Sequence, residues 1–400
     1  MRTRVRSHST NRVPARGVML ISERLGNEVF HRRFHRRIST MGVGVACALL
    51  LASCSSGSRS SSSEGTASSS GPAIQWSSNR QSTPVGGGWK SISCTGPRSC
   101  TVVGGSGNAT TAVLENGIWG APETIPGATM GGLLSVSCSS NSDCTAVGAG
   151  PPAGSSQGVA AAPVAFTKTH GVWSAANSII GASSNGFGGG MTSVSCLSIG
   201  NCIASGEDGA GPFVVQQTGG MWQPLSRIGG RSGSFNSVSC SAPICFVVGS
   251  SGRSPNGPLS ELLRDGTWVK ATFGAGPLES ISCWGFNQCV VVGNGSDGAF
   301  YQMDYNGIWS SASPLQFERG LTVRSVSCIP RGNGGVCVAI ASDNSTSAAA
   351  LIQPSSAMKP SPISIPNLSS ISCVPGNTCW VVGTTNTNST ASSVAISLSW

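Results

Sequence analysis

Histidine, tyrosine and charged side chains are scarce in this chain. Among its 400 residues there are 4 histidines and 2 tyrosines, and 10% of the residues are charged. Beyond residue 53 the only histidine is His170. A Ser-His-Asp triad would have to use that one side chain, and a zinc site built on histidines lacks ligands. The composition therefore gives no support to the commonest hydrolase and zinc-enzyme arrangements, and we expect His170 to be a surface residue in a turn.

The chain also lacks an apolar run long enough to remain as a membrane-spanning helix. Its candidate, Met41 to Leu51, is too short and follows the basic pairs Arg32-Arg33 and Arg36-Arg37, as is typical of a signal peptide. The run ends in Leu51-Ala52-Ser53-Cys54, which resembles the lipobox of bacterial lipoproteins. The resemblance implies cleavage before Cys54 and attachment of diacylglycerol to it. An ordinary secretory signal with a chance cysteine is the alternative.

The net charge of +9 comes from the N-terminal segment. Ten of the 24 Lys and Arg residues and two of the 15 acidic residues precede Cys54, so 14 basic and 13 acidic residues remain. A nearly neutral chain has no electrostatic footprint for nucleic acid, and we expect no such partner. After the signal peptide (residues 1–53), the Ser- and Gly-rich residues 54–72 predict a flexible tether.

A repeated motif dominates the remainder, residues 73–400. Seven times a Ser-Val-Ser-Cys or Ser-Ile-Ser-Cys sequence is followed by a second cysteine and an apolar run, usually ending in glycine. The motif cysteines are Cys94, Cys138, Cys196, Cys240, Cys283, Cys328 and Cys373. The period is about 45 residues, longer once between Cys138 and Cys196. Repeats of this length built from short strands predict an all-β fold, a seven-bladed β-propeller.

Each repeat predicts a blade of four antiparallel strands. In the first repeat the expected strands are Lys90–Cys94, Cys100–Gly104, Thr110–Glu115 and Ile118–Ile125, with a tight Asn116-Gly117 turn before the last. The final repeat lacks its fourth strand, whereas residues 73–80 precede the first repeat. We therefore expect residues 73–80 to complete the seventh blade beside residues 392–400, which would close the ring and remove free sheet edges.

The cysteines form local pairs within the repeats. An exported protein with two cysteines per repeat predicts disulfides, one per blade. The predicted pairs are Cys94 with Cys100, Cys138 with Cys144, Cys196 with Cys202, Cys240 with Cys245, Cys283 with Cys289, Cys328 with Cys337, and Cys373 with Cys379. A metal site needs converging ligands at tighter spacing, so no metal or cofactor is expected.

A candidate binding site lies where the innermost strands begin. Four residues before the first cysteine of each repeat stand residues of varied chemistry, while their predecessors are all apolar. This ring consists of Lys90, Leu134, Thr192, Asn236, Glu279, Arg324 and Ser369. Variation on a repeated scaffold favours ligand binding through Lys90, Asn236, Glu279 and Arg324 at the mouth of the central channel. A solvated rim of balanced charges is the alternative.

Glycoside hydrolysis is the main enzymatic alternative, because it needs only two carboxylates. The repeats loosely resemble the Asp-box repeats of sialidases, but the aspartate is missing from most turns, as in Asn116-Gly-Ile-Trp119. The tyrosines, Tyr301 and Tyr305, lie away from the expected mouth, and no acid–base pair stands out. No catalytic residue is assigned.

Residues 73–400 resemble secreted bacterial β-propeller repeat proteins, of actinobacterial type, with one disulfide per blade. The resemblance implies a lipoprotein at the extracytoplasmic face of the cell membrane that binds or scaffolds other molecules. We expect a protein or glycan partner on the propeller face opposite the disulfides. A sialidase-like hydrolase or lyase and a purely structural envelope protein are the alternatives.

Overall fold

The computed structural model describes residues 76–81, 88–105, 107–129, 132–151, 161–182, 189–253, 255–274, 276–332, 334–354, 356–363, 365–387 and 390–400. The predicted signal peptide (1–53), the lipidation residue Cys54 and the tether (54–72) lie outside the described residues.

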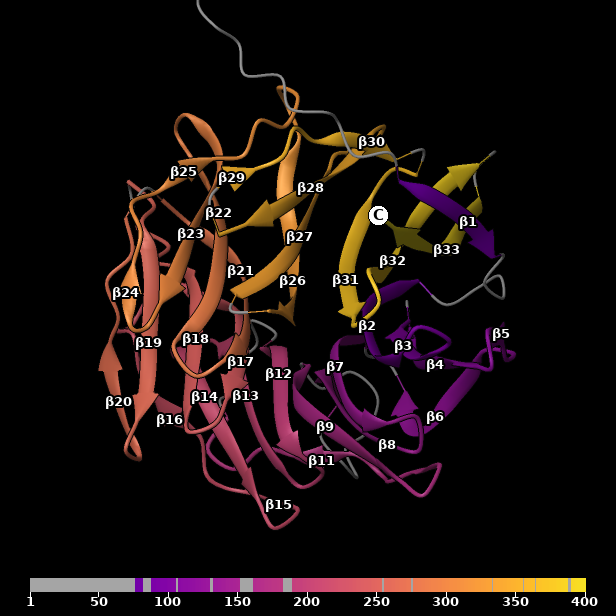
Figure 1. Ribbon diagram of the computed structural model, residues 1–400. Helices are drawn as coiled ribbons and strands as arrows, with labels where there is room; N and C mark the ends of the chain where they lie inside the picture. Colours follow the sequence, from indigo (N-terminus) through magenta and orange to yellow (C-terminus); the bar gives the residue numbers. More distant parts are fainter. Residues whose placement is uncertain are drawn as a thin grey trace, which may run out of the picture. The chain divides into compact units, whose positions relative to one another are not determined.

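Seven small antiparallel sheets follow one another along the chain and surround a common axis (Figure 1). Blade 1 contains β2 (Trp89–Gly96), β3 (Ser99–Gly104), β4 (Asn108–Glu115), β5 (Ile118–Trp119) and β6 (Glu123–Thr129). Blade 2 contains β7 (Gly132–Ser140), β8 (Asp143–Gly150), β9 (Ala162–Thr169), β10 (Val172–Trp173) and β11 (Asn177–Ser178). Blade 3 contains β12 (Gly190–Ser198), β13 (Asn201–Asp208), β14 (Gly211–Thr218), β15 (Met221–Trp222) and β16 (Ser226–Arg227). Blade 4 contains β17 (Ser234–Ser241), β18 (Ile244–Ser250), β19 (Pro258–Arg264) and β20 (Thr267–Lys270).

The remaining blades continue in the same order. Blade 5 contains β21 (Leu278–Gly285), β22 (Gln288–Gly295), β23 (Gly298–Tyr305), β24 (Ile308–Trp309) and β25 (Ser313–Pro314). Blade 6 contains β26 (Thr322–Arg331), β27 (Gly334–Ser342), β28 (Ser347–Gln353), β29 (Ser356–Ala357) and β30 (Ser361–Ile363). Blade 7 contains β31 (Leu368–Val374), β32 (Thr378–Thr387) and β33 (Thr390–Ser399), and β1 (Ser77–Gln81) pairs with β33. The predicted all-β, seven-bladed propeller is confirmed. Among the described residues, no helix is long and apolar enough to cross a membrane.

We name the strand positions of a blade A to D, from the axis outward. Strands A of neighbouring blades contact one another around the whole ring, including β2 with β31. Position D differs from the prediction of one strand, because in five blades it consists of two short pieces that both pair with strand C. In blade 1 the break follows Trp119, at Gly120-Ala-Pro122, where proline cannot donate to the ladder.

The hydrophobic core lies between blades. Seven clusters of buried side chains each draw residues from two consecutive blades. Between blades 1 and 2, for example, Val103 and Ile125 pack with Leu133 and Phe166. Each blade therefore depends on both neighbours for its burial, and apolar burial of this kind is the main source of stability.

The strand that precedes the first repeat pairs with the last strand of the chain. Residues Ser77–Gln81 of β1 run antiparallel to β33, with Ser77 opposite Ser399 and Gln81 opposite Ala395. Trp76 lies edge-on to Trp400, with ring centroids 5.7 Å apart.

The glycine that ends the apolar run in six of the seven repeats is explained by a close backbone approach. In blade 4, a Cβ atom at Gly249 would lie 1.9 Å from the carbonyl oxygen of Ser234 in the paired strand A. In blade 2, a Cβ at Gly148 would lie 2.1 Å from the carbonyl oxygen of Gly132. Only a residue without a side chain fits there unless the backbone shifts, and blade 6 carries Ala341 at this position.

Candidate functional site

A belt of serine hydroxyl groups joins the innermost strands. The motif serines accept hydrogen bonds from backbone N–H groups in strand A of the next blade; in blade 1, Ser91 accepts from Val136 and Ser93 from Cys138. Thirteen such bonds, 2.9–3.4 Å long, connect all seven interfaces, and Ser370 and Ser372 complete the circle from blade 7 to blade 1. Strand A is an edge strand, so the belt satisfies N–H groups that its own sheet leaves unpaired.

All seven predicted disulfides are present, one in each blade, and each joins the end of strand A to the start of strand B. In chain order they join Cys94 to Cys100, Cys138 to Cys144, Cys196 to Cys202, Cys240 to Cys245, Cys283 to Cys289, Cys328 to Cys337, and Cys373 to Cys379. The pairing predicted from the sequence is therefore confirmed in every blade. Seven disulfides indicate an oxidising, extracytoplasmic location.

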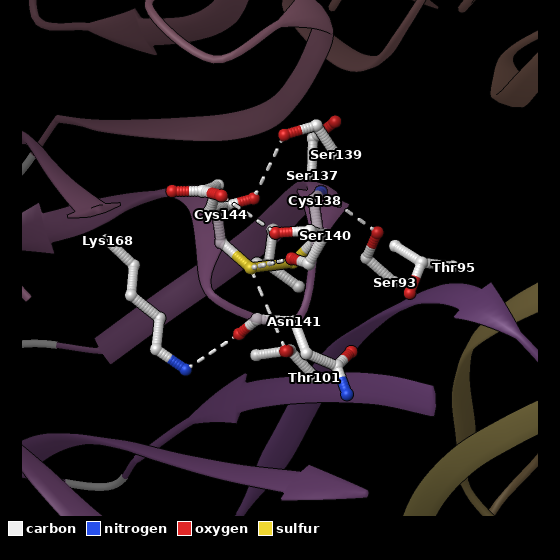
Figure 2. The surroundings of a disulfide bond; sticks show 12 residues. Ser93, Thr95, Thr101, Ser137, Cys138, Ser139, Ser140, Asn141, Cys144 and Lys168 are labelled. Atoms are coloured by element: carbon white, nitrogen blue, oxygen red, sulfur yellow. Dashed lines mark hydrogen bonds between the residues drawn. A yellow bond between two sulfur atoms is a disulfide. The ribbon is translucent and has the colours of Figure 1, made fainter. Parts of the chain in front are cut away.

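The second blade shows how closely a disulfide lies to the neighbouring blade. Figure 2 shows the bond between Cys138 and Cys144 next to Ser93 of blade 1. Beside it, the buried Lys168 ammonium donates to the carbonyl oxygen of Asn141 at 2.9 Å. Burial lowers the pKa of Lys168, and nearby carboxylates oppose that change. This lysine thus has a structural role in the hairpin that carries the disulfide.

The disulfides define two ends of the propeller. The A–B and C–D hairpins lie at one end, which we call the disulfide end. The B–C and D–A connections lie at the other, which we call the mouth end. Because strand A runs from the mouth end toward its first disulfide cysteine, the seven ring residues predicted from sequence begin these strands at the mouth end.

Every one of the seven ring residues lies in a β-bulge. The A–B register shifts at the ring position in each blade, for example between Trp89 and Ser91 around Lys90 and between Val323 and Ser325 around Arg324. A bulge leaves one residue unpaired and turns its side chain away from the regular alternation. The repeat thus presents one side chain per blade whose identity the sheet does not dictate.

Three of these ring side chains hold neighbouring blades together. Asn236 donates from Nδ2 to the carbonyl oxygen of Leu278 at 2.9 Å, and Ser369 donates from Oγ to the carbonyl oxygen of Trp89 at 3.2 Å. Thr192 makes the equivalent bond to Phe235. The acceptor in each case is the residue just before the ring position of the next blade. The structure therefore gives Asn236, predicted to bind ligand, a contact between blades 4 and 5.

The three charged members of the ring, Lys90, Glu279 and Arg324, differ in their hydrogen bonding. Glu279 accepts a hydrogen bond from Asn294 Nδ2 at 3.3 Å, and the same amide group spans to the carbonyl oxygen of Val323 in blade 6 at 3.2 Å. Lys90 and Arg324 are exposed and have no hydrogen bond or ion pair with any described residue. They belong to blades 1 and 6, on either side of blade 7. Among the seven ring residues, the charged ones are thus two free cations and one positioned carboxylate.

The other side chains considered for catalysis or metal binding make structural contacts. Asp208 is engaged by Arg227, with Nη1–Oδ1 and Nη2–Oδ2 distances of 2.8 and 2.9 Å. Tyr301 is buried in the cluster between blades 5 and 6, so it is not exposed at the mouth. The backbone N–H of His170 donates to Asp143 Oδ1 in a C–D turn at the disulfide end. Within the described ranges, no group of three or more His, Cys, Asp or Glu residues is arranged to hold a metal ion.

The comparisons with known proteins concern the fold alone. No family and no curated protein matches the sequence. Among solved structures, the chain is similar to YCF48 bound to D1 peptide (14% identity, TM-score 0.50, covering 82% of this chain and 96% of that one). It is similar to U3-55K (8%, TM-score 0.55, covering 78% and 96%) and to the WD40 β-propeller domain of Doa1 (11%, TM-score 0.53, covering 80% and 96%).

The fold is a β-propeller similar in structure to these proteins, and the fold alone assigns no activity. In this chain no tryptophan is followed by aspartate, so the Trp-Asp dipeptide typical of WD40 blades is missing. Disulfides and the serine belt stabilise its inner strands instead.

Sequence reasoning missed the serine belt. The motif serines are the acceptors that connect the blades. The signal was present, because two hydroxyl groups recur on either side of a β-branched residue in all seven edge strands. Neutral Val or Ala would fill the same space but would accept no hydrogen bond.

Proposed function

We propose that this protein is a lipid-anchored, extracytoplasmic binding module that recognises an acidic segment of a protein partner at the mouth end. The observation that carries the proposal is the ring of bulged residues, in which Lys90 and Arg324 are exposed cations without partners. Two cations separated by one blade favour a carboxylate-bearing chain laid across blade 7. Glu279 beside Arg324 would disfavour an indiscriminate polyanion, because like charges repel at close range.

The comparison with YCF48 supports this proposal in one respect. That protein, of similar fold, is described as bound to a peptide. The lipid anchor at Cys54 is part of the proposal and depends on the lipobox resemblance.

Peptide arrays test the proposal. Acidic, neutral and basic peptides of matched length are presented to the full-length protein, beside a glycan array. We expect preferential binding to acidic peptides that weakens about tenfold or more in a Lys90→Ala/Arg324→Ala variant, since charge-assisted hydrogen bonds contribute roughly 1.5–3 kcal/mol each. The matched control is Arg331→Ala/Lys359→Ala, which removes two exposed cations of blade 6 away from the mouth. Equal loss in both variants, or binding to glycans only, would refute the assignment.

We also propose that β1 closes the ring by completing blade 7. Its pairing with β33 supports this, because β33 would otherwise be a free edge strand. Ser78→Pro/Asn79→Pro removes two backbone donors from β1. We expect faster hydrogen exchange of the β33 amides from Ala395 to Ser399. A Ser68→Pro/Ser69→Pro control in the tether leaves that exchange unchanged; equal exchange in all three proteins would contradict the closure.

A further inference from the structure

The exposed apolar residues gather at the disulfide end. Ten large apolar side chains are exposed among the described residues, and seven of them lie at this end. Four occupy the same position of the repeat, between the glycine and the tryptophan of the C–D hairpin. They are Ile118, Val172, Met221 and Ile308, which are 70–75% exposed. Leu197 and Phe286, in A–B hairpins, are half exposed at the same end. Because these four side chains occupy the same position of the repeat in separate blades, all of them protrude from the same end of the propeller.

Strand β1 begins at this same end. Strand D starts at the C–D turn, and β1 begins with Ser77 opposite Ser399, the last residue of β33. Trp76 therefore lies beside Trp400, whose carbonyl oxygen accepts a hydrogen bond from Asn377 in the A–B turn of blade 7. Trp76, the first described residue, thus lies at the disulfide end.

The length of the segment between Cys54 and Trp76 limits how far a lipid anchor can lie. Twenty-one residues lie between Cys54 and Trp76, and a random-coil Ser/Gly linker of such a length has an average end-to-end distance of about 25 Å. An eight-residue strand such as β2 is itself about 26 Å long. An anchored tether therefore keeps the disulfide end nearest to the bilayer, with the mouth end on the far side.

We propose that the disulfide end docks on the lipid bilayer, with the four C–D hairpin tips inserted at the boundary of headgroups and acyl chains. This inference rests on the acylation of Cys54 and on the strand closure proposed above. Charged residues in the A–B and C–D hairpins of the disulfide end have both signs, Arg98, Arg264 and Arg331 against Glu115, Asp143 and Asp265. Docking is therefore driven by apolar insertion and does not require anionic lipid.

Docking in this orientation leaves the mouth end facing away from the membrane. Lys90 and Arg324 point toward the compartment outside the membrane, where a partner protein reaches them without crossing the lipid headgroups. The two ends of the propeller thus have separate tasks, one facing the lipid and one facing the partner.

Native tryptophan fluorescence tests the docking without any label. Trp119, Trp173, Trp222 and Trp309 directly follow the four apolar tips in the sequence. The acylated full-length protein is reconstituted into phosphatidylcholine vesicles with or without brominated acyl chains, which quench tryptophan at contact range. We expect strong quenching in the wild type and an approximately tenfold smaller quenched fraction in Ile118→Ser/Val172→Ser/Met221→Ser/Ile308→Ser. The control Leu134→Ser/Ile180→Ser changes exposed apolar residues elsewhere and keeps the wild-type quenching.

The outcomes separate the docking from the anchor. Co-flotation with vesicles measures the anchor, and quenching measures the docking. If the wild type floats with the vesicles but is not quenched, or if the quadruple variant is quenched like the wild type, docking is wrong and the lipoprotein assignment stands. If the wild type does not float, the acylation is wrong and docking loses its basis. If the quadruple variant converts a dimer into a monomer with no change in quenching, the apolar tips bind a second copy and the proposal is refuted.

Discussion

Removal of one belt serine is the sharpest test of how the blades are joined. In Ser93→Ala, the N–H of Cys138 loses its acceptor, which is 3.0 Å away in the wild type, and no other described group bonds to it. The bond is partly buried at the interface between blades 1 and 2, where Val136 and Cys144 are buried beside it. Because a fully buried donor left unsatisfied costs about 1–3 kcal/mol, the lower end of that range applies to this position.

The assay is urea denaturation with the disulfides intact, together with hydrogen exchange of the Cys138 amide. We expect the free energy of unfolding to fall by about 1 kcal/mol and the Cys138 amide to exchange faster. The matched control is Ser139→Ala, which removes a hydroxyl one residue beyond Cys138 that is exposed and donates only a long bond of 3.4 Å.

A further change probes the next interface. Ser137→Ala removes the acceptor of Cys196 N–H between blades 2 and 3. We expect the double variant Ser93→Ala/Ser137→Ala to lose roughly the sum of both effects, because the two bonds share no partner. If Ser93→Ala and Ser139→Ala differ by less than about 0.5 kcal/mol, and Cys138 exchange is unchanged, the belt does not stabilise the ring and our reasoning fails.

Three other changes test separate features. Burial raises the pKa of Asp304, which is 1% exposed. Because the pKa of this carboxyl group is higher in the folded than in the unfolded protein, the free energy of unfolding falls as the pH rises between the two pKa values. We expect Asp304→Asn to raise the Tm at pH 7, and this increase in Tm to vanish near pH 4. Gly249→Ala puts a methyl group against a backbone oxygen and lowers the free energy of unfolding by about 1–3 kcal/mol, whereas Ala341→Gly costs at most about 1 kcal/mol. Cys138→Ser/Cys144→Ser costs about 2 kcal/mol, which is the chain-entropy value for a loop of this size. Calorimetry at several pH values measures the effect of Asp304→Asn, and urea denaturation measures the effects of the glycine, alanine and cysteine substitutions. A change of opposite sign would contradict the corresponding prediction.

The sequence alone determined the blade number and the disulfide pairing. A motif repeated seven times specifies seven units, and two cysteines within each unit have partners close in sequence. Both properties are local, because antiparallel pairing across a short hairpin brings Cys94 opposite Cys100 without help from the rest of the chain. The alternation of serine with a β-branched residue likewise predicted strand A correctly. The breaks in strand D were missed, because two short pieces leave little periodic pattern.

Only the tertiary structure decided which ring residues remain free. Asn236 and Arg324 occupy equivalent positions, but the amide group of Asn236 reaches a carbonyl oxygen of the next blade, whereas Arg324 has no such bond. The difference depends on the spacing between blades, to which residues more than 40 positions apart contribute. Similarly, the apolar tips of four hairpins belong to one surface only because every blade has the same orientation around the axis. The contacts between repeats form only when the whole ring closes, so the sequence of a single repeat does not predict them.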